Sequence, residues 1–310
     1  MLARPYAGEA DLPCMTAFAA HNLDARRGRS SWHPGDIVWM MLTHSHMGLF
    51  DNRRDIRLWL NDAGDCLALA WFYGPRFARF EVRPDHPDLG EEVLGWIEDH
   101  VPVMNPGQDV RLRIDAMDDD AAKCELLARA GYHAGSRFGE VLCAELDGFG
   151  PEHAVPDGME VHDCVEVDEH ARAQCHRDAW SSLDHIGRPD AVSQFHDHIY
   201  RALRRAIRYN PELDLVVATA DGALAACSIA WADDESRFGV FEPVGTRPAW
   251  RGLRLSAILV EQSMLRLRER GMRHAYVMSS ESNNPTAYRA YRRSFDPIGR
   301  QRFHYRDFAS

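Results

Sequence analysis

The residues best suited to chemistry lie in the last quarter of the chain, where an apolar run leads into a segment rich in arginine and glycine. The segment reads Thr246-Arg-Pro-Ala-Trp-Arg-Gly-Leu-Arg-Leu-Ser256, and an apolar helical pattern follows it up to Gly271. Glycine lets the backbone approach a ligand closely, and the unpaired N–H groups of a first helical turn favour an anion. Arg251 and Arg254 add positive charge. We therefore expect a phosphate-binding loop here.

The segments that follow this loop extend the pattern. The apolar helix leads to a predicted strand, Ala275 to Met278, and then to Asn284-Pro-Thr-Ala-Tyr-Arg-Ala-Tyr291. This order resembles the GNAT superfamily of acyl-CoA-dependent N-acyltransferases, whose loop has the form Arg/Gln-x-x-Gly-x-Gly/Ala. The loop here departs from that form in two places, because Arg254 and Ser256 stand where the family has small residues.

The resemblance implies that acetyl-CoA, or another acyl-CoA, binds at this loop and at the strand before it. The implied cofactor-binding residues are Val244, Gly245, Thr246, Arg251, Gly252, Leu253, Arg254, Leu255, Ser256 and Asn284. A bulge in the strand would free a backbone N–H near Val244 and Gly245 to stabilise the oxyanion. Pro243, which cannot donate to a strand ladder, is consistent with such a break.

Glu242 is the candidate general base. It lies four residues before Thr246, so the period of a strand predicts that both side chains share one face. A carboxylate there could take the proton of an attacking amine directly or through water. Alternatively, Glu242 pairs with Arg237 or Arg247 and has only a structural role.

Tyr291 is the candidate general acid, because the resemblance places it where many relatives protonate the departing thiolate. A phenol with a pKa of about 10 can donate to a thiolate of about 8.5. Tyr291 could instead pack on the inner face of the helix beside Ala287, with Tyr288 as a nearby substitute for the acid. Asn284 could contact the pantetheine or cap a helix that begins at Pro285.

One long, diverged internal repeat indicates the architecture. Leu58–Trp71 and Val216–Trp231 both read as strand, glycine-containing turn, strand, and both end in Ala-Trp. A strand ending in Arg-Pro and then a helix follow each of them. The sequence predicts an α/β (α+β) protein of two tandem GNAT-like domains, each with a mixed, mostly antiparallel central sheet flanked by helices.

We place the domain boundary in residues 146–158, where three glycines and two prolines interrupt all periodicity. The predicted domains are residues 1–148 and 159–310, joined by a linker at 149–158. In the first domain, Pro87 and Asp88 occupy the position of the phosphate-binding loop. Acidic residues there suit a first helical turn and would repel phosphates, so we expect a degenerate domain without a cofactor site.

The composition and charge of the chain disfavour several classes of protein. The chain has 310 residues, 45% apolar and 27% charged, and no apolar run reaches membrane-spanning length. Seven cysteines without a C-x-x-C pair, and the absence of a signal-like start, favour a cytoplasmic location. A net charge of -11 disfavours general nucleic-acid binding and is compatible with a cationic amine substrate. The oligomeric state stays open.

Other polar clusters predict little. His44-Ser-His46 and His196-Asp-His198 lack further ligands at recognisable spacing, so we expect no metal site. Cys227 could carry an acyl group, but the sequence implies no histidine partner for it.

Two segments could face the acceptor. Trp180–Gly187 offers Asp184 and His185, and Trp32–Asp36 combines aromatics with a turn at the corresponding place of the first half. Either could face a cleft between the domains, although ordinary loop and turn packing also explains them.

The sequence thus predicts a GNAT-family N-acetyltransferase that transfers an acetyl group to a small-molecule amine by direct attack in a ternary complex. A non-catalytic CoA-binding or interaction protein is the alternative. A transferase that uses aminoacyl-tRNA is disfavoured by the acidic charge and by the CoA-type loop.

Overall fold

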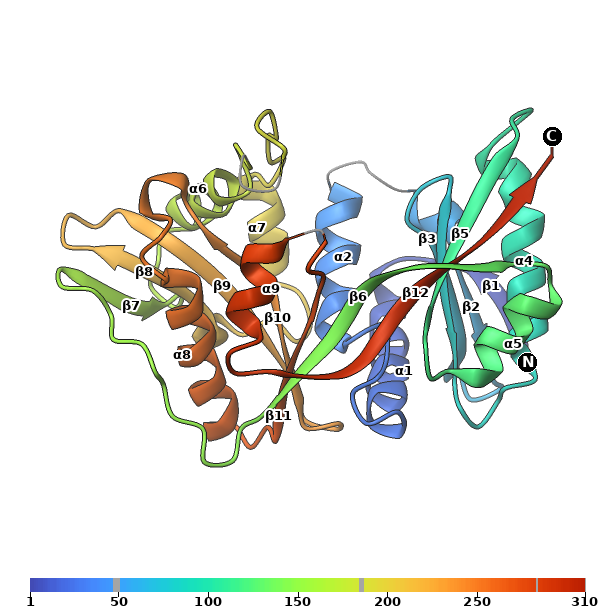
Figure 1. Ribbon diagram of the computed structural model, residues 1–310, viewed down its shortest axis with the longest axis horizontal. Helices are drawn as coiled ribbons and strands as arrows, with labels where there is room; N and C mark the ends of the chain where they lie inside the picture. Colours follow the sequence, from blue (N-terminus) through green and yellow to red (C-terminus); the bar gives the residue numbers. More distant parts are fainter. Residues whose placement is uncertain (47–50, 184–186, 283, 310) are drawn as a thin grey trace.

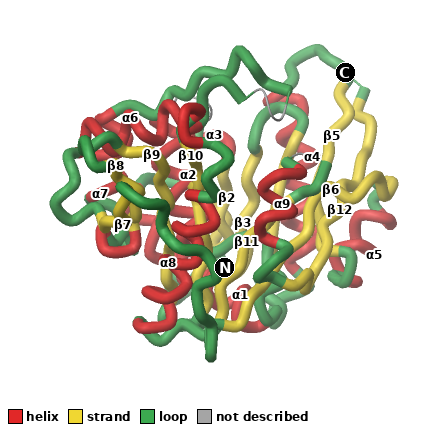
Figure 2. The backbone as a smooth tube through the Cα atoms, turned by 60° about the vertical axis from the view of Figure 1, so that its left-hand side comes forward, coloured by secondary structure: helices red, strands yellow, loops and turns green. Residues whose placement is uncertain are grey.

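A sheet of twelve strands runs through the molecule, with helices on both of its faces (Figures 1 and 2). The structure is a computed structural model, and it describes residues 1–46, 51–183, 187–282 and 284–309. The strands lie in the order β1-β2-β3-β4-β5-β12-β6-β11-β10-β9-β8-β7. Among the described residues, no helix combines the length and the apolar character needed to cross a bilayer.

The first half of the chain supplies six strands and five helices to the described structure. Its elements are β1 (Leu2–Pro5), α1 (Leu12–Ala25), α2 (Pro34–His46), α3 (Asn52–Asp55), β2 (Ile56–Leu60), β3 (Cys66–Phe72), β4 (Phe77–Val82), α4 (Leu89–Met104), β5 (Val110–Met117), α5 (Ala121–Arg129) and β6 (His133–Glu145).

The second half repeats this order. Its elements are β7 (Met159–Asp163), α6 (Glu169–Ala179), α7 (Asp197–Arg204), β8 (Asp214–Thr219), β9 (Leu224–Asp233), β10 (Phe238–Thr246), α8 (Leu255–Glu269), β11 (His274–Ser279), α9 (Pro285–Tyr291) and β12 (Asp296–Phe308).

Strand pairing confirms the internal repeat residue by residue. In the first half Ala70 pairs with Phe80, and in the second half Ala230 pairs with Phe241. Each of these phenylalanines precedes a glutamate, so Glu81 is the structural counterpart of Glu242. The mixed, mostly antiparallel sheet with flanking helices is therefore as predicted.

The two halves exchange their last strands. β6 pairs with β11 of the second half, β12 pairs with β5 of the first half, and β6 and β12 pair with each other (Figure 1). The strand order is symmetric about this central pair. Each half of the sheet therefore depends on a strand from the other half, and the predicted cut in residues 146–158 divides the sequence but not the sheet.

The core lies in layers on the two faces. In the second half, α8 packs on one face through Leu255, Ile258 and Leu259. The other face is covered by α6, α7 and, from the first half, α2, in a cluster that includes Trp39, Phe195 and Tyr200. Helix α2 thus joins the two halves (Figure 1).

Candidate functional site

The site begins where two parallel strands separate. β10 and β11 pair only from Phe238 to Val240, opposite His274 to Tyr276, although β10 continues to Thr246. Beyond Val240 a register shift between Phe241 and Val244 marks a bulge against β9, which lies at Glu242 and Pro243. The break that the sequence predicted near Val244 is confirmed, one to two residues earlier. Past Val240, β10 therefore has no strand partner on its β11 side among the described residues.

The bulge also corrects one expectation from the sequence. Glu242 and Thr246 do not share a face, because the Thr246 hydroxyl lies 2.7 Å from that of Ser256 at the start of α8, whereas Glu242 interacts with Asp36 of α2 on the opposite side. Two residues of β10 stand opposite one on β9, so the alternation of side chains changes phase here. The carbonyl oxygen of Glu242 accepts a hydrogen bond of 2.8 Å from the Trp231 indole, which holds the bulge in place.

A cleft of about 600 Å³ opens beside this separation, between the end of β10, the start of α8, and α9. Ten of the twelve predicted site residues line it: Val244, Gly245, Thr246, Arg251, Gly252, Arg254, Leu255, Ser256, Asn284 and Tyr291. Leu253 does not line the cleft and is 44% exposed. Glu242 also lies outside this lining, at the bulge.

The first turn of α8 presents free backbone donors to the cleft. Arg254 occupies the N-cap position, and the first bond of the helix runs from the Ile258 N–H to its carbonyl oxygen. The N–H groups of Leu255, Ser256 and Ala257 have no partner among the described residues, and all three residues line the cleft. Such donors, together with the helix dipole, suit an anion.

Two positions of the loop have left-handed backbone. Gly252 has φ of +88°, and a Cβ atom placed on it would meet nothing within 4 Å, so conformation rather than space requires glycine there. Arg254 has φ of +59° and lies where the resembled family has glycine. An arginine at this position keeps the turn at some conformational cost and adds a cation.

The cleft carries arginines with different roles. Arg251 donates to the carbonyl oxygens of Ala179 and Ser182, so its guanidinium fixes the loop to the end of α6. Arg254, Arg289 and Arg293 also line the cleft, and none of them has a carboxylate partner among the described residues. In a chain with a net charge of -11, these three free cations make this cleft a local anion site.

Hydrogen bonds distinguish the roles of Tyr288 and Tyr291. The Tyr288 hydroxyl donates to Glu140 of β6 at 2.5 Å, so Tyr288 is committed to a structural contact. The Tyr291 hydroxyl has no hydrogen-bond partner in the described part of the chain, and burial together with the Glu242 charge raises its pKa. Tyr291 therefore stays protonated and lies within electrostatic reach of Glu242.

Asn284 acts as a helix cap. Its side-chain oxygen accepts from the Ala287 N–H at 3.1 Å, and Pro285 follows at the first helical position. The structure thus shows one of the two predicted roles, the cap. Asn284 also lines the cleft, where the other role, contact with a ligand, would take place.

The carboxyl of Glu242 is unusual for a glutamate. Burial, and secondarily the charge of Asp36, raise its pKa to about 8. Neither of its predicted arginine partners lies on it, because Arg237 donates to the Gly271 carbonyl and Arg247 pairs with Asp178 at 2.8 Å. A carboxyl that titrates near neutral pH, without an arginine partner, can act as a general base.

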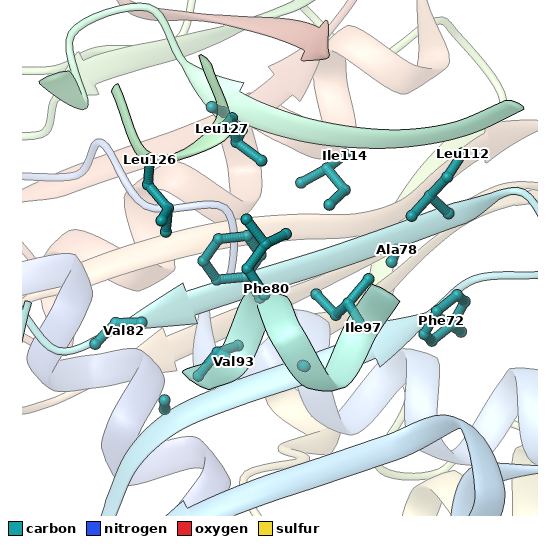
Figure 3. Close-up of a cluster of buried hydrophobic side chains, with 14 of the residues drawn as sticks. Phe72, Ala78, Phe80, Val82, Val93, Ile97, Leu112, Ile114, Leu126 and Leu127 are labelled. Atoms are coloured by element: carbon teal, nitrogen blue, oxygen red, sulfur yellow. The ribbon is translucent and has the colours of Figure 1, made fainter. Parts of the chain in front are cut away.

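In the first half, an apolar cluster lies between α4, α5 and the sheet. Apolar side chains from α4, α5 and the strands, among them Phe80, Ile97 and Leu127, occupy the space (Figure 3). The Lys123 ammonium donates to the Phe80 carbonyl at 2.6 Å, on the strand equivalent to β10. Glu81, the counterpart of Glu242, accepts from Ser30 at 2.8 Å and from Asn22 at 3.0 Å.

The segment of the first half that leads to the position of the phosphate-binding loop contains an ion pair of its own. Arg83 forms a two-bonded ion pair with Asp85, at 2.7 and 3.0 Å. Asp88 precedes α4 without a side-chain cap. That the first half has no cofactor site stays a prediction.

The remaining candidates from the sequence are the acceptor-facing residues and the histidine pairs. Asp184 and His185 lie outside the described residues, as do the side chains of His44 and His46. Within the described residues, no group of three or more His, Cys, Asp or Glu side chains could hold a metal ion.

Cys227 has a histidine neighbour that the sequence did not imply. It interacts with Cys175 and His176, and all three side chains are buried beneath the sheet. Burial without access to the cleft lining argues against an acyl-carrying role.

Three residues of the site were missed from the sequence. Arg289 and Arg293 stand four residues apart around Tyr291, a helical spacing that could have marked a basic face. Tyr276, which pairs opposite Val240 and contacts Asp36, gave no signal, because its role depends on a helix from the other half.

Comparison with known proteins indicates the same family as the sequence motifs. Residues 180–296 match the model of the acetyltransferase (GNAT) family. No curated protein matches the chain.

Solved structures match over the whole length. A GCN5-related N-acetyltransferase from Sphaerobacter thermophilus is 20% identical with a TM-score of 0.60, over 100% of this chain and 96% of its own. A tandem GNAT protein from the clavulanic acid biosynthesis pathway is 16% identical with a TM-score of 0.60, over 99% and 98%. A GNAT-family acetyltransferase from Colwellia psychrerythraea is 12% identical with a TM-score of 0.57, over 99% and 100%.

At these identities the likeness shows the fold, whereas the family model covers the part of the chain that holds the cleft. Residues 180–296 therefore match the GNAT acetyltransferase family, and the chain as a whole has the fold of a tandem GNAT protein.

Proposed function

We propose that this protein is an acyl-CoA-dependent N-acetyltransferase that transfers an acetyl group from acetyl-CoA to a small amine. The observation that carries the proposal is the meeting of three features at one place. An anion-binding helix start, a separated strand pair and two unpaired titratable groups, Glu242 and Tyr291, converge around one cleft.

The cleft fits the polyanionic part of CoA. The free N–H groups of Leu255, Ser256 and Ala257 would bind the pyrophosphate, and Arg254, with Arg289 and Arg293, would neutralise phosphate charge. The unpaired side of β10 from Val244 to Thr246 would hold the extended pantetheine arm by backbone hydrogen bonds. This arrangement would deliver the thioester to the bulge.

The chemistry then requires few groups. The amine nitrogen attacks the thioester carbonyl, so a C–N bond forms and the C–S bond breaks. Glu242 accepts the proton that the amine loses, and Tyr291 donates its proton to the departing thiolate. A backbone N–H of the bulged strand near Val244 would stabilise the oxyanion between these steps.

The test is release of free CoA from acetyl-CoA in the presence of a panel of amines: the common amino acids, ethanolamine, putrescine, tryptamine and aniline. We expect acetylation of at least one aliphatic amine, with product identified by mass spectrometry. Glu242→Gln should lower kcat strongly, most above about pH 8, where the wild-type carboxyl is ionised and can accept a proton. A wild-type protein that binds CoA but acetylates nothing on a broad panel would contradict the proposal.

A non-catalytic CoA-binding protein is the second candidate, and two observations favour it. Arg254 has left-handed backbone where the family has glycine, and the Arg251 side chain is occupied by carbonyl oxygens. A binder of this kind would hold CoA equally well after Glu242→Gln and Tyr291→Phe and would show no turnover with any amine. The same panel therefore separates the two functions.

A further inference from the structure

We propose that the first half of the chain completes the acceptor site, and that Asp36 binds the ammonium group of the acceptor amine. The proposal rests on the acetyltransferase function proposed above. It makes the acceptor a protonated aliphatic amine and makes both halves necessary for one active site.

Helix α2 docks directly on the separated strands. His33, just before this helix, lies with Nε2 3.1 Å from the Phe238 carbonyl oxygen of β10. Gly35 packs against Trp231 so closely that a Cβ atom placed on it would lie 2.3 Å from the indole. Because the same indole holds the Glu242 carbonyl, the start of α2 and the bulge form one unit.

Asp36 lies at the point where β10 and β11 part. Its Oδ2 accepts from the Tyr276 hydroxyl at 3.2 Å, and Tyr276 pairs with Val240, the last residue of β10 that is paired to β11. Glu242 follows two residues later and interacts electrostatically with Asp36. The carboxylate from the first half therefore stands beside the proposed base.

One oxygen of Asp36 is available to a ligand. Both structural bonds of this carboxyl, from the His33 N–H at 2.9 Å and from Tyr276, use Oδ2. Oδ1 has no hydrogen-bond partner in the part of the chain that the structure describes. Asp36 and Glu242 are both half-buried residues and keep partial exposure to solvent.

In the described part of the chain, neither Asp36 nor Glu242 forms an ion pair with a cation. Arg79 is the cation whose charge acts on Asp36, and it is committed to Asp115 at 2.9 Å. A tyrosine hydroxyl lies near each carboxyl, that of Tyr276 at Asp36 and that of Tyr291 near Glu242. Burial raises the pKa of Asp36 to about 6, below that of Glu242, so Asp36 is the carboxyl that is ionised at neutral pH.

These positions give Asp36 and Glu242 different roles. Asp36 binds the protonated amine through its free oxygen, and Glu242, which is ionised above about pH 8, then takes the proton that must leave before the nitrogen attacks. An aliphatic ammonium fits this pair, whereas an arylamine, which is neutral at pH 7, gains nothing from Asp36. The first half, although it is predicted to have no cofactor site, thus sets which amine is accepted.

The test compares wild type with Asp36→Asn on the amine panel. Asparagine keeps an oxygen that can accept from His33 and Tyr276, so the start of α2 should remain folded while the charge is lost. We expect KM for the best aliphatic amine to rise about ten- to a hundredfold, the range for one charge-assisted hydrogen bond, with KM for acetyl-CoA unchanged. Activity with aniline, relative to the aliphatic amine, should increase.

Asp168→Asn is the matched control. Asp168 is a capping carboxylate at the start of α6 that accepts from the Ala171 N–H at 2.9 Å, and it lines no part of the cleft. Its replacement should leave both KM values unchanged. An Asp36→Asn variant with unchanged KM for the amine, or with kcat and both KM values altered together, would overturn the proposal. Absence of amine acetylation by the wild type would instead refute the proposed function itself.

Discussion

Replacing Glu242 by glutamine should reduce the dependence of stability on pH. Burial and the Asp36 charge raise the pKa of this carboxyl from 4.5 to about 8. The stability that its protonated form contributes is therefore fully present below about pH 4.5 and is lost as pH rises to about 8. From about pH 5 to 8, at about 1.4 kcal/mol per unit, the loss approaches about 4 kcal/mol. Because the side chain keeps partial solvent contact, we expect about half of this, or about 2 kcal/mol.

Urea unfolding at a series of pH values from about 5 to 8.5 measures this difference without any knowledge of the acceptor. The free energy of unfolding of Glu242→Gln should rise relative to wild type as pH increases. Glu235→Gln, at an exposed carboxylate in the turn between β9 and β10, should track wild type throughout. Parallel curves for Glu242→Gln and wild type would refute the reasoning, since the carboxyl would then not be held in a burying environment and would not titrate near neutral pH.

Three further outcomes are expected. Tyr291→Phe should lower kcat with little change in acyl-CoA affinity, whereas Tyr288→Phe should retain turnover; steady-state kinetics and calorimetry check both, and equal effects would remove Tyr291 from the mechanism. Arg254→Gly should raise the free energy of unfolding by up to about 1 kcal/mol in urea, because glycine adopts φ of +59° freely; a clear loss would show that the side chain stabilises the loop. Residues 159–310 produced alone should aggregate or remain unfolded by circular dichroism, because β11 and β12 lose their pairing with β6; a folded monomer would contradict the exchange of strands.

Much of the second half could be predicted from the sequence, because its signals are local. The glycine and arginine content of residues 246–256, the apolar stripe that follows and the Asn-Pro start at Asn284 each depend on neighbouring residues alone. The two segments that contain a glycine turn and end in Ala-Trp also predicted the paired strands of both halves. Their shared register, Ala70 with Phe80 and Ala230 with Phe241, was a consequence of the repeat.

What the sequence could not predict arises between the halves. The exchange of β6 and β12 leaves no local mark, since each strand would have the same pattern beside either partner. The sequence left Trp32–Asp36 either as a segment facing the acceptor or as an ordinary turn, and only the docking of α2 on Trp231 brings Asp36 to Glu242. The phase change at the bulge was hidden for a similar reason, because an extra residue in a strand is defined by the strand beside it.

The central claim is that one cleft, in the second half, binds the acyl donor. Calorimetric titration with CoA and acetyl-CoA tests it most directly. We predict one site per chain, with affinity lowered severalfold by Arg293→Ala, which removes a free cation of the cleft, and unchanged by Arg83→Ala, which removes a paired arginine of the first half. Two sites per chain, no binding, or equal loss in the two variants would contradict the account.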